Sequence, residues 1–113
     1  MSQYMQIDVR IVPFYEKPFE KNFPEIAALL KSASYGEDLE GEVSLYVLVD
    51  SLVSLSRHPM TPSAIKQKIG PYADRMAPIK RMARESLTAR KLNELDQFLY
   101  QIEDLFEDLE SNL

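Results

Sequence analysis

Residues 92–113, LNELDQFLYQIEDLFEDLESNL, decide the fold because their apolar side chains recur in an unbroken pattern. The spacing alternates between three and four residues and runs through Leu92, Leu95, Leu99, Ile102, Phe106, Leu109 and Leu113. Side chains at this spacing occupy the a and d positions of three heptads on one face of an α-helix. Phe98 and Leu105 widen that face to the breadth typical of a helix in a globular bundle. The segment therefore predicts a long amphipathic helix whose apolar face must be covered.

The other side of this predicted helix is acidic. It carries Asp96, Glu103, Asp104, Glu107, Asp108 and Glu110, and residues 92–113 contain no lysine or arginine. Charge of this density increases the rate of encounter with an oppositely charged partner. We therefore predict a protein-binding face formed by these six carboxylates. The alternative is that they only keep the helix solvated.

Length and composition indicate one soluble globular domain covering residues 1–113. Hydrophobic residues make up 45% of the chain and charged residues 27%, which is ordinary for a globular protein. No apolar run is long enough to span a bilayer, and the N-terminus lacks the pattern of a secretory signal, so we expect a cytoplasmic protein with no membrane partner. The absence of cysteine excludes disulfides, thiol nucleophiles and thiolate metal sites.

The net charge of −5 conceals a strong segregation of charge along the chain. Residues 1–56 carry nine acids and four bases, residues 57–91 carry two acids and nine bases, and residues 92–113 carry seven acids and no base. The local net charges are therefore −5, +7 and −7. Either the basic segment neutralises the acidic helix within the fold, or one or both are kept for a charged partner.

The N-terminal part predicts one strand and two helices. Apolar and polar residues alternate from Met5 to Ile11, which is typical of a short half-buried strand. Such a strand needs a partner, either in the same molecule or in a second copy, so a homodimer is an open alternative. Asn22 is expected to cap a helix that ends at Gly36. Polar residues form only a narrow stripe between Leu39 and Ser56, which predicts a buried second helix.

The segment from Thr61 to Leu87 predicts two further helices. Thr61 is expected to cap a short helix, Pro62–Ile69, that is stopped by Gly70 and Pro71. A second helix begins at Ala73, and the apolar phase predicts a bend or break near Ser86 to Thr88. The predicted fold is thus a mainly α, single-domain bundle of four to five helices with a short N-terminal β-strand.

This same segment resembles the outline of a helix-turn-helix, with a short capped helix, a glycine turn and a basic amphipathic helix. The resemblance implies a DNA-binding regulator that uses residues 61–87. Two features depart from the motif, namely Lys66 where a small residue is usual and Pro78 within the reading helix. The candidate basic face, for a protein partner or for nucleic acid, consists of Lys66, Lys68, Arg75, Lys80, Arg81 and Arg84.

Catalytic groups are scarce. His58 is the only histidine and precedes a proline in a predicted turn. The sequence identifies no serine or aspartate that would act with it in a catalytic triad. Adjacent carboxylates such as Glu103 and Asp104 point about 100° apart on a helix and do not converge on one ion. The three glycines are too scattered to form a phosphate loop. We therefore expect no enzymatic activity, no cofactor and no metal.

The combined pattern predicts a non-catalytic protein-binding module of the inhibitor, immunity or adaptor type that presents a charged helical face. Small acidic helical proteins of these types often have this general composition, which is an analogy rather than a motif match. The helix-turn-helix regulator is the alternative.

Overall fold

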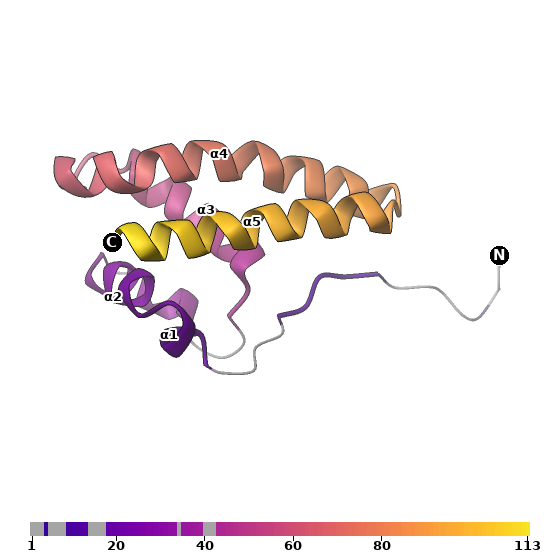
Figure 1. Cartoon of the computed structure of the whole chain (residues 1–113), viewed down its shortest axis with the longest axis horizontal. Helices are drawn as coiled ribbons and strands as arrows, with labels where there is room; N and C mark the ends of the chain where they lie inside the picture. The colour runs from indigo at the N-terminus through magenta and orange to yellow at the C-terminus, as the bar shows by residue number, and fades with distance from the viewer. Residues whose placement is uncertain (1–3, 5–8, 14–17, 34, 40–42) are drawn as a thin grey trace.

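The structure is a computed structural model that describes residues 4, 9–13, 18–33, 35–39 and 43–113 (Figure 1). This part of the chain is mainly helical, and none of its helices is both long enough and apolar enough to cross a membrane. The elements are α1 (Phe19–Asn22), α2 (Pro24–Ser32), a short 3-10 helix η1 (Gly36–Leu39), α3 (Leu45–Arg57), α4 (Ser63–Thr88) and α5 (Leu92–Asn112).

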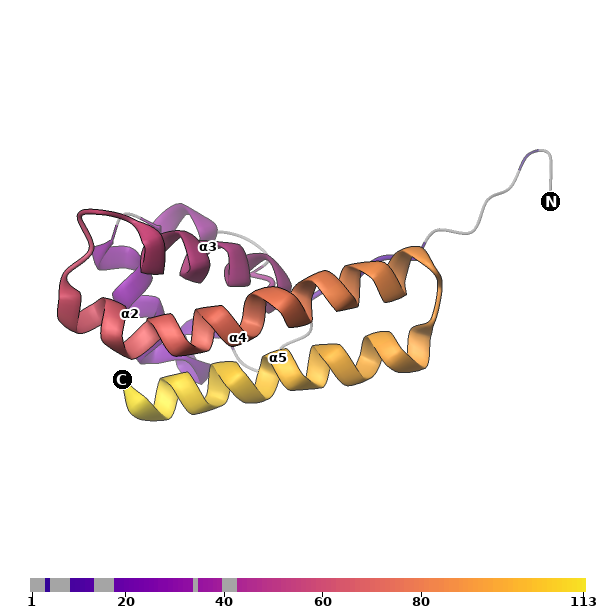
Figure 2. The same cartoon turned by 90° about the horizontal axis from the view of Figure 1, so that it is seen from above.

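Helices α4 and α5 form a long antiparallel hairpin, α2 and α3 pack against it, and α1 and η1 pack against α2 (Figures 1 and 2). Helix α3 lies along α4, and α2 packs near the C-terminal end of α5. The tip of the hairpin, where α4 meets α5, extends past the end of α3 (Figure 2). The predicted helical bundle is confirmed.

The apolar face of α5 is buried by its own molecule, as its spacing requires. Leu95, Ile102, Leu105, Phe106 and Leu109 are all buried in the core. Phe98, Leu99 and Leu113 are half-buried. Leu92 is 54% exposed because it begins the helix at the hairpin tip, beyond α3. At the other end, the Phe106 ring meets Phe23 edge to face with centroids 6.1 Å apart, which joins the N-terminal helices to α5.

Helix α4 corrects the prediction for residues 61–87. Its 26 residues run from Ser63 to Thr88 without a break, and they include Gly70, Pro71 and Pro78. The predicted stop at Gly70 and Pro71 is wrong, and the two helices expected on either side of it are one. The turn of a helix-turn-helix is therefore absent.

A continuous buried face explains why the helix passes through these residues. The side chains of Ile69, Ala73, Met76, Ala83 and Ser86 are buried in succession, at a spacing that fits one helix across both prolines. Each proline removes the hydrogen bond to the carbonyl four residues earlier, which belongs to Gln67 or Asp74. Both of these residues are exposed, so water can satisfy the carbonyls that lose their partners.

The link between α4 and α5 lies where the spacing of apolar residues shifts and where a bend or break was predicted. Helix α4 ends at Thr88, which confirms the predicted break. The Lys91 amide donates to the Ser86 carbonyl at 2.8 Å and the Arg90 amide to the Leu87 carbonyl at 3.1 Å, which is a Schellman motif. Arg90 has φ 59°, the left-handed conformation that this motif needs and that glycine usually supplies.

The predictions for the N-terminal part differ from the structure in several details. Residues 5–8 of the predicted strand lie outside the described residues, and Val9–Ile11 belong to no strand. Helix α2 is confirmed, but Phe23 rather than Asn22 occupies its N-cap position. Helix α3 begins at Leu45 instead of Leu39, which ends η1.

Replacing Gly70 by alanine tests the continuity of α4. No atom outside the local helix lies within 4 Å of a Cβ built at Gly70, so the methyl group is accommodated. Glycine within a helix costs about 0.5–1 kcal/mol relative to alanine, so Gly70→Ala is expected to raise the free energy of unfolding by that amount in urea titrations.

The reciprocal control is Ala77→Gly in the same helix, which is expected to lower the free energy of unfolding by at least as much. If Gly70→Ala destabilises the protein instead, residue 70 adopts a turn conformation and α4 is interrupted there.

Candidate functional site

The predicted acidic residues lie along one side of α5. Asp96, Glu103 and Glu107 are exposed and, at spacings of seven and four residues, share one row of the helix. Tyr100, which is 60% exposed, lies in the same row between Asp96 and Glu103. A second row adjacent to the first contains Asp104 and Asp108, which are also exposed. We refer to Asp96, Glu103, Asp104, Glu107 and Asp108 as the acidic face.

The bases of α4 do not neutralise the acidic face. Within the described ranges, no lysine or arginine nitrogen lies within 4.0 Å of a carboxylate oxygen of α5. Lys80 instead pairs with Asp50 of α3 at 2.8 Å, and its ammonium group lies 4.3 Å from the centre of the Tyr46 ring. The two helices thus pack through their apolar faces, while their opposite charges remain on separate surfaces.

Partial burial and the neighbouring carboxylates both disfavour the ionised form of Glu103. Partial burial, followed by the charges of Glu107, Asp104 and Asp96, raises the pKa of the Glu103 carboxyl above its ordinary value of 4.5. A raised carboxyl pKa means that the folded protein binds the proton more tightly than the unfolded chain does. Ionised Glu103 therefore opposes folding above the raised pKa, and this cost disappears as the pH falls through it.

Glu110 has a structural role that the sequence did not reveal. Its Oε1 accepts hydrogen bonds from the backbone amides of Glu25 and Ile26 at 2.9 and 3.3 Å, and its Oε2 accepts from Glu25 at 3.0 Å. These are the unsatisfied amides in the first turn of α2, which has no side-chain cap of its own. Glu110 thus caps a helix that precedes it by 85 residues, and it is not part of the free acidic face.

The predicted basic residues do not form a single face. Lys66, Lys80 and Arg84 lie on one side of α4, whereas Lys68 and Arg75 lie on the opposite side and Arg81 between them, because the helix is continuous at 3.6 residues per turn. Lys80 is also occupied by Asp50 and Tyr46. The six residues are therefore spread around the continuous helix α4 rather than gathered on one side, and their role in binding a partner stays a prediction.

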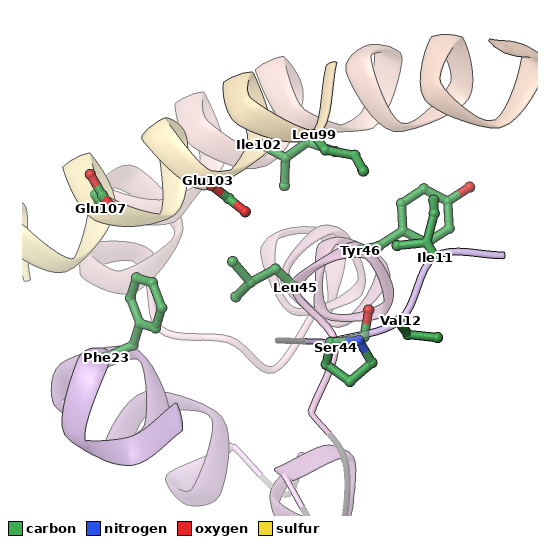
Figure 3. A pocket seen from close by; sticks show the side chains of 11 residues that line it. Ile11, Val12, Phe23, Ser44, Leu45, Tyr46, Leu99, Ile102, Glu103 and Glu107 are labelled. Atoms are coloured by element: carbon green, nitrogen blue, oxygen red, sulfur yellow. The ribbon is translucent and has the colours of Figure 1, made fainter. Parts of the chain in front are cut away.

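A pocket of about 320 Å³ adjoins the acidic face and was not predicted from the sequence (Figure 3). Leu99 and Ile102 of α5 form one wall, and Leu45 and Tyr46 at the beginning of α3 form another. The remaining wall includes Phe23, and residues 11–13 close one side. Glu103 and Glu107 line the same pocket, so two carboxylates of the acidic face border an apolar cavity.

The only histidine takes part in local structure. The Met60 amide donates to His58 Nδ1 at 3.0 Å, in the exposed loop between α3 and α4. Among the described residues, no group of three or more histidine, aspartate or glutamate side chains is arranged to hold a metal ion.

Comparisons with protein-family models, with curated proteins and with solved structures find no match to this chain. The function is therefore inferred from the geometry of the acidic face and the adjoining pocket.

Truncation of Glu110 tests its role as a cap. Glu110→Ala removes both acceptors of the α2 amides, and losing a helix cap typically costs 0.5–2 kcal/mol, so we expect the free energy of unfolding in urea to fall by about 1–2 kcal/mol.

The matched control is Asp108→Ala, which removes a carboxylate from an exposed position on the same helix. It is expected to change stability by no more than about 0.5 kcal/mol. Equal effects of the two substitutions would contradict the assignment of Glu110 as the cap of α2.

Proposed function

We propose that this protein is a non-catalytic protein-binding module, of the inhibitor, immunity or adaptor type, that binds a basic partner through the acidic face of α5. The observation that carries the proposal is the separation of charge in the α4–α5 hairpin. Nine bases lie in residues 57–91, yet none of those within the described residues pairs with the five exposed carboxylates. The acidic face is therefore available to cations from outside the chain.

The electrostatics of the acidic face favour a cationic partner. Like charges four residues apart on a helix, such as Glu103 and Glu107, destabilise it by roughly 0.2–0.5 kcal/mol. A lysine or arginine from a partner would relieve this repulsion and return the Glu103 pKa toward its ordinary value. A concentrated negative field also accelerates the encounter with a basic partner, and ionic strength reduces that acceleration.

The structure lacks the helix-turn-helix outline that suggested nucleic-acid binding by residues 61–87. The helix-turn-helix outline requires a turn near Gly70, and α4 is continuous there. Its basic residues are spread around the helix, and Lys80 is paired with Asp50. We therefore favour a protein partner and propose the acidic face, rather than α4, as the surface that binds it.

Charge reversal tests the proposed function. The variant carries Asp96→Lys, Glu103→Lys, Asp104→Lys and Glu107→Lys, and both it and the original protein are used for affinity capture from cells of the source organism. Each exposed ion pair contributes about 0.2–1 kcal/mol, so losing four pairs and introducing repulsion is expected to reduce recovery of the specific partner at least tenfold. Recovery by the original protein is expected to fall as salt is added.

The control variant reverses four exposed acids outside the acidic face, at Glu37, Asp74, Glu85 and Glu94, and so has the same net charge. Thermal melts verify that both variants are folded. The proposal is contradicted if the two variants recover the partner equally well, because net charge rather than the acidic face would then determine binding.

A further inference from the structure

We infer that the pocket beside Glu103 and Glu107 receives an apolar side chain from the partner, and that a lysine or arginine next to that side chain pairs with these two carboxylates. The inferred ligand is thus a polypeptide segment in which an apolar residue is flanked by basic residues. This inference rests on the proposed function, because it assigns the anchoring position within the same binding surface.

The walls of the pocket are suited to an apolar side chain. Ile102 and Phe23 form its buried parts, at 1% and 8% exposure, while Leu45, Tyr46 and Leu99 are half-buried and retain apolar surface that faces the cavity (Figure 3). Its volume of about 320 Å³ lies at the lower end of the range for ligand pockets, roughly 300–1,000 Å³. A cavity of this size can accommodate one large side chain but not an extended hydrophobic surface.

The polar groups around the pocket favour a peptide with positive charge. Glu103 and Glu107 supply acceptors on the α5 side, and among the described residues no lysine or arginine pairs with either carboxylate. On the α3 side, Ser44 occupies the N-cap position, but its side chain caps no amide. The Val47 and Leu48 amides donate to the Ser44 carbonyl, which leaves the Leu45 and Tyr46 amides as donors for carbonyl groups of a bound segment.

Charge complementarity identifies the occupant. An uncharged apolar ligand would use the walls but leave the two carboxylates without a partner, and an acidic segment would be repelled by them. Residues 11–13 of the chain itself form one wall of the pocket, so they are counted here as part of the pocket and not as its occupant. A basic segment with an apolar anchor uses both the walls and the carboxylates, and anchors of this kind usually carry much of the binding energy at protein interfaces.

Binding of three synthetic peptides, measured by fluorescence anisotropy, tests the inference without knowledge of the natural partner. The first, GKRKFKRKG, combines a phenylalanine with flanking bases. The second, GKRKSKRKG, keeps the bases and replaces the anchor by serine, and the third, GEDEFEDEG, keeps the anchor and reverses the charges. The first is expected to bind roughly tenfold to a hundredfold more tightly than the second, from burial of one aromatic side chain, and the third is expected not to bind.

Two variants fill the pocket from different walls. Leu99→Trp occupies it from α5, and Val12→Trp does so from residues 11–13, where Val12 is 61% exposed and its replacement does not disturb the core. Both are expected to abolish the advantage of the phenylalanine peptide over the serine peptide. Glu103→Gln with Glu107→Gln is expected to weaken the phenylalanine peptide at least threefold more than the matched pair Asp104→Asn with Asp108→Asn, which lies in the outer row.

The inference is overturned if the phenylalanine and serine peptides bind equally, if the advantage persists in both pocket-filling variants, or if the acidic peptide binds as well as the basic one. Equal binding of the two basic peptides, together with loss of both on charge reversal of the acidic face, would reject the pocket while supporting the proposed function. If neither basic peptide binds, the pocket is not an anchoring site, and the capture experiment decides the proposed function separately.

Discussion

Burial of the apolar face of α5 is the constraint on which the rest of the structure depends. Each large apolar side chain removed from water contributes about 1.5–3 kcal/mol, and five of those on α5 are buried. Helix α4 supplies most of the covering surface, and α2 and α3 complete it. Because this burial fixes the rotation of α5 about its own axis, it also determines that Asp96, Glu103, Asp104, Glu107 and Asp108 face water.

The same constraint explains why α4 is a single helix. Its buried residues must match the length of α5, and that packing outweighs the local preference of Gly70 and Pro71 for a turn. The prolines are tolerated because the carbonyls they leave without hydrogen bonds belong to exposed residues, Gln67 and Asp74. Local turn signals are weak compared with a continuous apolar face, and here they predicted a break at Gly70 and Pro71 that does not occur.

The spacing of apolar residues along the sequence predicted α5, the mainly helical architecture and the end of α4 near Thr88. It could not predict contacts between residues distant in sequence. The cap that Glu110 provides for α2 spans 85 residues, and no local pattern indicates it. The pocket combines residues 11–13 and Phe23 with parts of α3 and α5, so only the packed structure reveals it. The acidic residues were identifiable from sequence, but their separation from the bases of α4 was not.

The central claim is that the carboxylates of the acidic face pair with no base in the part of the chain that the structure describes. The most direct measurement is an NMR titration of the Glu103 side-chain carboxyl carbon with pH, in the absence of any partner. A midpoint above the ordinary 4.5 is expected, because burial and neighbouring carboxylates both disfavour ionisation. A midpoint below that value would show that a lysine or arginine of the chain pairs with Glu103, and it would contradict the existence of a free acidic face.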